Sequence, residues 1–369
     1  MPDKINVIID GRMIDKHLHG IARYTYELIK YGQLSNKINY TVLVNDLDEA
    51  KEIFFDIEGL TFIKMKSKFL SIKEQFELPI IINKYNNIIF HSPSFVSSPF
   101  INKNMIMTIH DLNHIQFPQF YKFFHKYYYK LIVKFSAKKC KKILTVSNFS
   151  KSELVEWLNC TTDHVAVTYN GIGESFKPVM NENIIKTIQS KYGLPPRFIL
   201  YLGNLKPHKN VGTLLKAINH IKDKEISLVL NGYPTDEIQY LINKIKISDR
   251  VKFIGFVDDD DLATLYSSAE LFIFPSMYEG FGLPPLEAMA CGCPTIVSSS
   301  ASLPEIVLDG ATKFNTFDEK DLAMKINCLI GNVELDNLIK KGINRSKCFT
   351  WEKCFNETYE EYYKIWRGR

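Results

Sequence analysis

A repeating alternation of short apolar runs and longer amphipathic stretches most constrains how this chain can fold. Six β-branched runs punctuate its first half: Lys4–Asp10, Tyr40–Val44, Asn87–Phe90, Met105–Ile109, Lys142–Val146 and Val165–Tyr169. After Gly20, apolar residues recur at helical spacing at Ile21, Tyr24, Leu28 and Ile29. Strands that alternate with helices in this way predict parallel strands joined by crossover helices.

The alternation restarts after residue 196, which predicts a second domain. Its strand candidates are Phe198–Leu202, Ser227–Leu230, Val251–Ile254, Leu271–Phe274 and Thr295–Val297. A chain of 369 residues is long enough for two domains, and the Gly- and Pro-rich segment Asn170–Pro196 is the natural boundary. We therefore expect α/β domains at residues 1–175 and 176–350, followed by a tail at 351–369.

Composition excludes several other classes of protein. Hydrophobic residues make up 46% and charged residues 24% of the chain, which is typical of globular proteins and not of disordered or collagen-like ones. The seven cysteines are an odd set without C-x-x-C spacing, and we recognise no secretory leader, so we expect a reduced, cytoplasmic protein. Cys291 and Cys293 have no nearby His or Cys at ligand spacing, so no metal is expected there. No apolar run approaches the roughly 18–20 residues that span a bilayer.

Positive charge is concentrated in one segment of the first half. The formal net charge is +5, but Leu112–Ser152 has nine lysines and no Asp, Glu or Arg, so the rest of the chain sums to −4. Five of these lysines recur every four residues, as a stripe along a helix with aromatic residues around it: Lys122, Lys126, Lys130, Lys134 and Lys138. A basic aromatic helix is typical of an anionic-membrane contact, here spanning Lys122–Lys142. A solvated lysine face with its aromatics in the core is the alternative.

The segment Pro275–Pro294 is the most informative for chemistry. A strand candidate is followed by Gly280, Phe281 and Gly282, and then by two prolines that suit the first turn of a helix. Glycines allow a ligand to approach the backbone, and a helix N-terminus attracts phosphate. Glu279 and Glu287 flank this turn. Carboxylates repel phosphate, so these two would accept hydrogen bonds from sugar hydroxyls, unless Glu279 caps the helix and Glu287 is solvated.

Two other loops follow strand candidates at the edge where open α/β sheets bind ligands. In Gly203–Asn210, Lys206 and Lys209 could neutralise phosphate oxygens, although solvated loop lysines are common. His110 follows the strand Met105–Ile109, and Asp111 could orient its imidazole. A His–Asp pair by itself is equally compatible with a purely structural role.

Taken together, these segments resemble the retaining glycosyltransferases of family 4, which have the GT-B fold. The matching motifs occur in the family's order along nearly the whole chain: Gly20–Tyr24, Ile109–Asp111, Thr145–Asn148, Asn170–Ile172, Tyr201–Asn210, Asp249–Gly255 and Ser276–Pro294. The spacing of Glu279 and Glu287 around the Gly-Phe-Gly turn is the most specific of them. The resemblance implies two Rossmann-like domains facing across a cleft, with the last helix (351–369) returning to the first domain.

The resemblance also implies roles for individual residues. His110, Lys209 and Glu279 would serve catalysis: the first at the transferring sugar, the second on the diphosphate and the third at the donor sugar. Glu287 would hold the ribose hydroxyls of the nucleotide. The remaining donor contacts would come from Gly20, Asn204, Gly280, Phe281, Gly282 and Leu283.

One position departs from the family pattern. Many relatives have Arg where this chain has Asn204, so one positive charge of the phosphate clamp is missing, and Lys206 or Arg23 could replace it. The loop sequences look most like the branch that builds bacterial surface polysaccharides, including O-antigen mannosyltransferases. We therefore expect transfer of a hexose, with GDP-mannose as the first candidate donor and a UDP-sugar next, to a saccharide on a lipid carrier. No cofactor or metal is expected, and the site would lie in the cytoplasm or at the inner face of the membrane.

Two other functions remain open on the sequence. A metal-dependent sugar transferase of another fold could use the acidic run Asp258–Asp261, although this run is better interpreted as the cap of a helix that begins near Asp261. A non-enzymatic nucleic-acid binder could use the lysine stripe. The low overall charge and the absence of a recognisable nucleic-acid motif argue against that second alternative.

Overall fold

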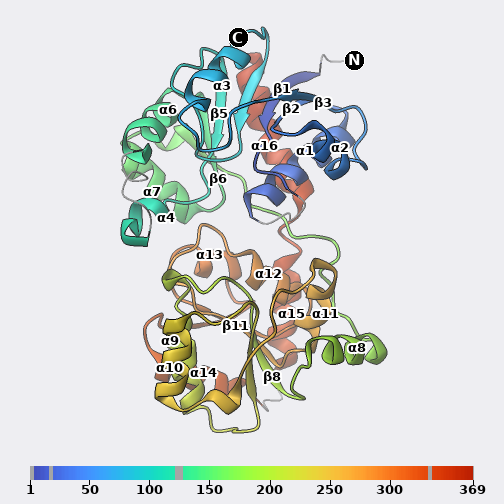
Figure 1. Ribbon diagram of the computed structural model, residues 1–369, viewed down its shortest axis with the longest axis vertical. Helices are drawn as coiled ribbons and strands as arrows, with labels where there is room; N and C mark the ends of the chain where they lie inside the picture. Colours follow the sequence, from blue (N-terminus) through green and yellow to red (C-terminus); the bar gives the residue numbers. More distant parts are fainter. Residues whose placement is uncertain (1–3, 16–19, 121–127, 331–334, 369) are drawn as a thin grey trace. The chain divides into compact units, whose positions relative to one another are not determined.

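A computed structural model describes residues 4–15, 20–120, 128–330 and 335–368 (Figure 1). The chain forms two compact units, which are described separately. The first comprises residues 1–171 and 351–369, and the second comprises residues 172–350. None of the helices built from the described residues is both long and apolar enough to span a lipid bilayer.

The first unit is built on a parallel sheet of seven described strands in the order β3-β2-β1-β4-β5-β6-β7. The strands are β1 (Ile5–Asp10), β2 (Ile38–Val44), β3 (Thr61–Lys64), β4 (Ile89–Ser92), β5 (Asn104–Thr108), β6 (Lys142–Thr145) and β7 (Val165–Val167). Its helices are α1 (Ile21–Ser35), α2 (Leu47–Ile53), α3 (Glu74–Ile82), α4 (Asn113–Gln116), α6 (Lys134–Lys139), α7 (Asn148–Leu158) and α16 (Trp351–Arg367). A π-helical turn, η2 (Tyr129–Val133), leads into α6.

Helices cover both faces of this sheet, because successive side chains of a strand point to opposite faces. In β1, Val7 and Ile9 pack with α1, α2 and α16, whereas Ile8 packs with α3, α6 and α7. The resulting two apolar layers explain why the strands are continuous hydrophobic runs.

The last helix, α16, packs on the first unit, although 179 residues of the second unit precede it in the sequence. Figure 1 shows this red helix beside the blue elements α1 and β1. The side chains of Trp351, Phe355 and Tyr362 are buried in the same layer as α1. Gly32 of α1 leaves no room for a Cβ beside Phe355 and the Tyr40 ring, which brings the two helices into close contact.

The second unit repeats the architecture with a parallel sheet of six described strands in the order β10-β9-β8-β11-β12-β13. The strands are β8 (Phe198–Tyr201), β9 (Ser227–Leu230), β10 (Val251–Phe253), β11 (Leu271–Phe274), β12 (Thr295–Ser298) and β13 (Thr312–Phe314). Its helices are α8 (Glu182–Tyr192), α9 (Val211–His220), α10 (Asp236–Ile245), α11 (Leu262–Ser268), α12 (Leu283–Ala290), α13 (Leu303–Val307), α14 (Glu319–Leu329) and α15 (Leu335–Ser346). The prediction of two Rossmann-like α/β folds is confirmed.

Two strands were not predicted, and both lie at a sheet edge. Among the described strands, β3 pairs with β2 alone and β13 pairs with β12 alone. Each is short and partly exposed, so neither has the continuous apolar run that marks a buried strand. Their positions depend on pairing with a neighbour that is distant in the sequence.

Candidate functional site

In the second unit, the strand order reverses between β8 and β11, which pair in parallel. The loops that follow two such strands diverge, and open α/β sheets bind ligands in the space between them. The loop after β8 contains Asn204 and leads through a short 3₁₀ turn, η4 (Pro207–Lys209), into α9. The loop after β11 contains Glu279 and leads into α12. The two most informative motifs of the sequence therefore lie at the same edge of one sheet.

An ion pair joins these two loops. The Lys209 Nζ atom donates to the Glu279 Oε1 atom at 2.6 Å, and the two side chains are only 14% and 16% exposed. The Lys209 ammonium also lies 5.4 Å from the centre of the Phe274 ring. The structure thus places two of the three predicted catalytic residues in direct contact.

Hydrogen bonds from the surrounding backbone and side chains hold both loops in place. The Met277 N–H donates to the His208 carbonyl at 2.8 Å, which ties one loop to the other. The buried Ser302 hydroxyl bonds to the carbonyls of Glu279 and Phe281, both at 2.9 Å. Asn210 donates to the Pro275 carbonyl at 3.1 Å. The backbone on either side of the ion pair is therefore fixed before any ligand arrives.

The turn into α12 depends on its second glycine. Gly282 has φ +110°, which L side chains rarely adopt, and a Cβ there would lie 2.7 Å from the Leu303 side chain. Leu283 begins the helix, and the next two residues are prolines, which have no N–H. Backbone donors in the first turn of α12 are consequently confined to Leu283 and to Gly282, which directly precedes the helix.

Glu287 lies within α12 and is buried, with 7% of its surface exposed. The Tyr266 hydroxyl of α11 donates to its Oε2 atom at 3.1 Å. Burial and the adjacent Glu287 carboxylate raise the pKa of Tyr266 well above its usual value, so the phenol stays protonated and remains a donor. The sequence does not indicate this contact, because Tyr266 and Glu287 lie on different helices and no local pattern links them.

Asn204 stands where many relatives have Arg, and it adds no positive charge beside the Lys209–Glu279 ion pair. Its side-chain oxygen accepts from the Lys206 N–H at 3.2 Å, and its carbonyl accepts from the Tyr201 hydroxyl at 2.7 Å. Lys206 itself is exposed in the loop. Asn204 thus shapes the turn, and Lys206 is the nearest additional cation along the chain.

The acidic run Asp258–Asp261 directly precedes α11, as predicted, but Asp261 at the N-cap position does not make the expected side-chain cap. Residues 259–261 form a short 3₁₀ turn, η6. The carboxylates of Asp258 and Asp261 instead pair with Lys191, at 2.7 and 2.6 Å. This pairing depends on tertiary structure, because α8 brings Lys191 beside the acidic run.

Among the described residues, His, Cys, Asp and Glu side chains do not form groups of three or more that could hold a metal ion.

In the first unit, His110 follows β5 and is half-buried. Its Nε2 atom lies 3.1 Å from the Pro93 carbonyl, which can only accept, so Nε2 carries the proton. Removal from water lowers the pKa of His110 to about 4, so the ring is neutral at physiological pH. The Tyr24 ring meets the imidazole edge-on, with centroids 4.8 Å apart.

A second motif holds the backbone at His110. The Thr145 hydroxyl donates to the Ile109 carbonyl at 2.7 Å, and the Ser150 hydroxyl donates to the His110 carbonyl at 3.1 Å. Asp111 accepts from the Asn113 N–H at 2.9 Å. Gly20 is the residue before α1, with φ +53°, and its carbonyl accepts from Tyr24. The motif residues of the first unit thus support one another around the ends of β5 and α1.

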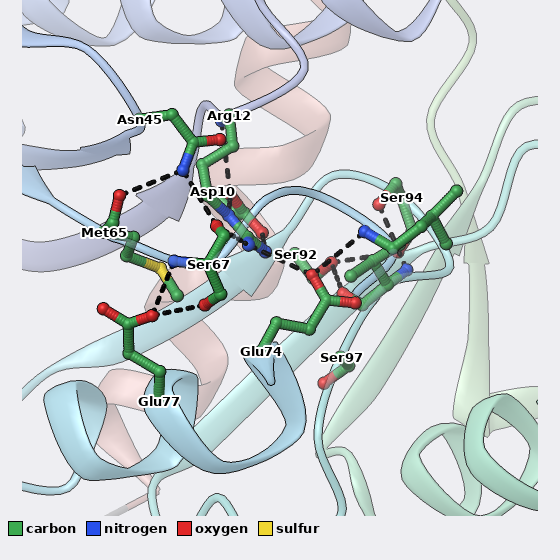
Figure 2. A network of polar contacts seen from close by, with 12 residues as sticks. Asp10, Arg12, Asn45, Met65, Ser67, Glu74, Glu77, Ser92, Ser94 and Ser97 are labelled. Atoms are coloured by element: carbon green, nitrogen blue, oxygen red, sulfur yellow. Dashed lines mark hydrogen bonds and ion pairs between the residues drawn. The ribbon is translucent and has the colours of Figure 1, made fainter. Parts of the chain in front are cut away.

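The first unit also contains a buried ionic network that no local sequence pattern indicates (Figure 2). Arg12, just after β1, donates to both oxygens of Asp10, at 2.8 and 2.7 Å, and to Glu74 at 3.0 Å. All three side chains are almost fully buried. Burial raises the pKa of Glu74 to about 7. This network lies beside the point where the order of this sheet reverses, and it connects α3 to β1.

The lysine stripe lies partly outside the described residues, which omit Lys122 and Lys126. Of the remainder, Lys130 and Lys138 are exposed, and Lys134 lies 5.6 Å from the centre of the Trp157 ring. The aromatic residues of this segment support both interpretations of the stripe. Tyr129 is buried, as expected for a core residue, whereas Phe135 is 60% exposed, as expected for a membrane contact.

All seven cysteines are free thiols, and Cys291 and Cys293 are buried.

Comparison with known proteins identifies the family. Residues 18–176 match the model of Glycosyltransferase Family 4, and residues 184–345 match that of Glycosyl transferases group 1. The chain is 28% identical to the O-antigen chain mannosyltransferase B of Escherichia coli, over 97% of this chain and 99% of that protein. It is 29% identical to an O-antigen chain mannosyltransferase of Salmonella typhimurium, over 64% and 67% respectively.

A solved structure shares the fold. A glycosyltransferase from Rickettsia africae superimposes with a TM-score of 0.76 at 20% identity, covering 98% of this chain and 99% of that one. The two family models cover one unit each, in the order in which their motifs occur along the sequence. The protein is therefore a glycosyltransferase that belongs to family 4 and has the GT-B fold.

Proposed function

We propose that the protein transfers a mannosyl group from GDP-mannose to a saccharide, with retention of the anomeric configuration. The observation that carries this proposal is the contact between Lys209 and Glu279 at the reversal point of the second sheet. A cation and a carboxylate on adjacent loops suit the two parts of a nucleotide-sugar, whose diphosphate is anionic and whose sugar donates hydrogen bonds. The O-antigen mannosyltransferases among its relatives favour mannose as the sugar.

In this proposal, Glu287 accepts hydrogen bonds from the ribose hydroxyls and Glu279 accepts them from the sugar. Lys209, together with Gly280, Phe281, Gly282 and Leu283, contacts the diphosphate and the sugar. Asn204 and Gly20 provide further contacts to the donor, and the neutral His110 contacts the transferring sugar. No metal or other cofactor takes part.

The chemical step breaks the bond between the anomeric carbon and the diphosphate oxygen, and the electron pair stays with the diphosphate. Negative charge therefore develops on the leaving group, where the Lys209 ammonium and the backbone donors before α12 stabilise it. The acceptor hydroxyl attacks from the same face and passes its proton to a phosphate oxygen. The new glycosidic bond thus forms with retention and without a base from the protein.

We further propose that the acceptor is a saccharide on a lipid carrier and that the enzyme acts at the inner face of the cytoplasmic membrane. The same O-antigen relatives and the lysine-rich helix of the first unit support this part. The expectation of a membrane contact through Lys122–Lys142 is retained here, and nucleic acid is not a proposed partner.

Binding and product analysis test the proposal. Thermal-shift titrations with GDP, UDP and ADP should raise the unfolding temperature most for GDP, because a ligand that binds the folded state stabilises it. Turnover of GDP-mannose in a chelator should equal that in its absence, and NMR of the product should show the α configuration of the donor. Stabilisation by none of the nucleotides, or an inverted product, would refute the assignment; loss of turnover in chelator would favour a metal-dependent transferase.

A further inference from the structure

Three large apolar side chains are exposed together on α3 and on the loop between β4 and β5. Phe76 and Ile80 are each 61% exposed, and Phe100 is 57% exposed. The rings of Phe76 and Phe100 are stacked, with centroids 6.3 Å apart. With Pro79 and Asn83, these side chains line an open groove of about 340 Å³. Contiguous apolar surface of this kind marks a contact with a partner or a membrane.

The helical segment 128–139 lies beside this apolar surface. The Gln75 side chain donates to the Tyr128 hydroxyl at 3.3 Å, and the Lys139 ammonium donates to the Pro99 carbonyl at 2.8 Å. These two contacts hold the segment along α3 and the loop at residues 97–102. Leu131 and Phe135 lie between the contact points at helical spacing and are 63% and 60% exposed. We call the surface formed by these five exposed apolar residues the α3 face: Phe76, Ile80, Phe100, Leu131 and Phe135.

The exposed charged side chains described on the elements of the α3 face are lysines. From Leu78 to Ser152 the chain has eleven lysines, one Asp and no Glu or Arg. Exposed lysines on the elements of the α3 face are Lys73, Lys84, Lys130, Lys138 and Lys139. The two acidic residues of α3 are engaged elsewhere: Glu74 pairs with buried Arg12, and Glu77 accepts from the backbone of Lys66 and Ser67.

We propose that the α3 face docks onto an anionic lipid bilayer, with its apolar side chains entering the headgroup region and its lysines contacting lipid phosphates. This inference rests on the proposed function only in that a lipid-linked acceptor brings the enzyme to a membrane. Charge complementarity selects the occupant, because a second copy of the chain would bring two lysine-rich surfaces together. Aromatic side chains ringed by lysines match the apolar and anionic layers of a bilayer surface.

Vesicle flotation of the full-length protein tests the proposal. The protein should float with vesicles that contain phosphatidylglycerol and remain at the bottom with phosphatidylcholine alone, and added salt should weaken the binding. Lys130→Gln with Lys138→Gln should lower the partition coefficient about fivefold for each lysine. Phe76→Ser with Phe100→Ser should lower it at least as much, because two exposed rings are removed from the contact.

Matched substitutions elsewhere on the same unit serve as controls. Phe55 is 83% exposed and Lys51 is exposed, so Phe55→Ser and Lys51→Gln should bind vesicles like the parent protein. Equal binding to both vesicle types, or unchanged binding of the Phe76/Phe100 variant, would overturn the proposal. A dimer in sedimentation that this variant dissociates would assign the face to a second copy instead.

Failure of this inference and failure of the proposed function are distinguishable. Thermal shifts with GDP and transfer to a water-soluble acceptor do not require a membrane. Nucleotide binding and transfer without vesicle binding would refute the α3 face and the membrane contact, but not the proposed transfer reaction. Vesicle binding without any nucleotide binding would refute the proposed transfer reaction and leave the α3 face standing.

Discussion

The Lys209 ammonium lies 2.6 Å from the Glu279 carboxylate, and the two residues come from loops that follow adjacent strands. The pair neutralises itself in the absence of ligand. In the proposed function, a donor diphosphate would compete with Glu279 for Lys209, and Glu279 would then be released toward the sugar. The proposal therefore gives this pair a role beyond that of a structural link between two loops.

Replacing Lys209 tests its role in charge stabilisation. Lys209→Ala should lower kcat about 10²–10³-fold, the range seen when one group that stabilises developing negative charge is removed. Lys206→Ala is the matched control from the same loop. It should lower kcat much less than Lys209→Ala does, unless Lys206 replaces the absent arginine. Steady-state rates with the natural donor and acceptor measure both. Near-normal turnover of a folded Lys209→Ala enzyme would contradict the assignment.

Removing the Tyr266 hydroxyl tests how Glu287 is positioned. In Tyr266→Phe, the carboxylate loses a donor at 3.1 Å, and a hydrogen bond to a charged group contributes about 1.5–3 kcal/mol. We expect roughly tenfold weaker GDP binding, a higher KM for the donor and little change in kcat. Calorimetric titration with GDP and with 2′,3′-dideoxy-GDP measures the effect. Equal weakening for both nucleotides would mean that Tyr266 acts on stability and not on ribose recognition.

Truncating Phe355 tests how far α16 stabilises the first unit. Phe355 is 1% exposed and packs in the layer that contains α1, so Phe355→Ala should lower the free energy of unfolding by about 3–5 kcal/mol. Tryptophan fluorescence during urea unfolding reports this unit selectively, because Trp157, Trp351 and Trp366 all belong to it. The exposed Glu360→Ala on the same helix should change stability by less than about 0.5 kcal/mol. Similar values for the two variants would contradict this role.

The pKa of His110, lowered to about 4 by removal from water, predicts a specific pH dependence. An unfolded histidine titrates near 6.5, so the contribution of His110 to stability is complete above that pH and is lost as pH falls toward 4. Between about pH 7.5 and pH 5, the parent protein should lose more stability than His110→Asn. Over the same range His110 stays neutral, so it should add no step near 6.5 to the kcat profile. A step there that His110→Asn abolishes would show that the ring titrates normally.

Much of the fold could be predicted from local sequence. Buried parallel strands must be apolar on both sides, so runs such as Leu271–Phe274 are visible without any tertiary information. The turn that begins α12 was predictable because glycines and prolines restrict the backbone itself. The edge strands β3 and β13 could not be predicted, since neither has a continuous apolar run and each forms by pairing with a neighbouring strand.

The candidate site, like the fold, is only partly predictable from the sequence. The residue types of Lys209, Glu279 and Glu287, and their positions after strands, are visible in the sequence. The Lys209–Glu279 contact, the Tyr266 donor to Glu287 and the pairing of Asp261 with Lys191 join residues 70, 21 and 70 positions apart. Contacts of that range depend on strand order, which no local pattern encodes.

The sequence by itself determined the two α/β units, the loops that carry the candidate chemistry and the resemblance to a family. Only the tertiary structure decided which side chains meet, the neutral state of His110 and the grouping of exposed apolar residues on the α3 face. The physical reason is that secondary structure follows from backbone preferences and hydrophobic periodicity, which act over a few residues. Burial, ion pairing and pKa shifts follow from neighbours that only the folded chain brings together.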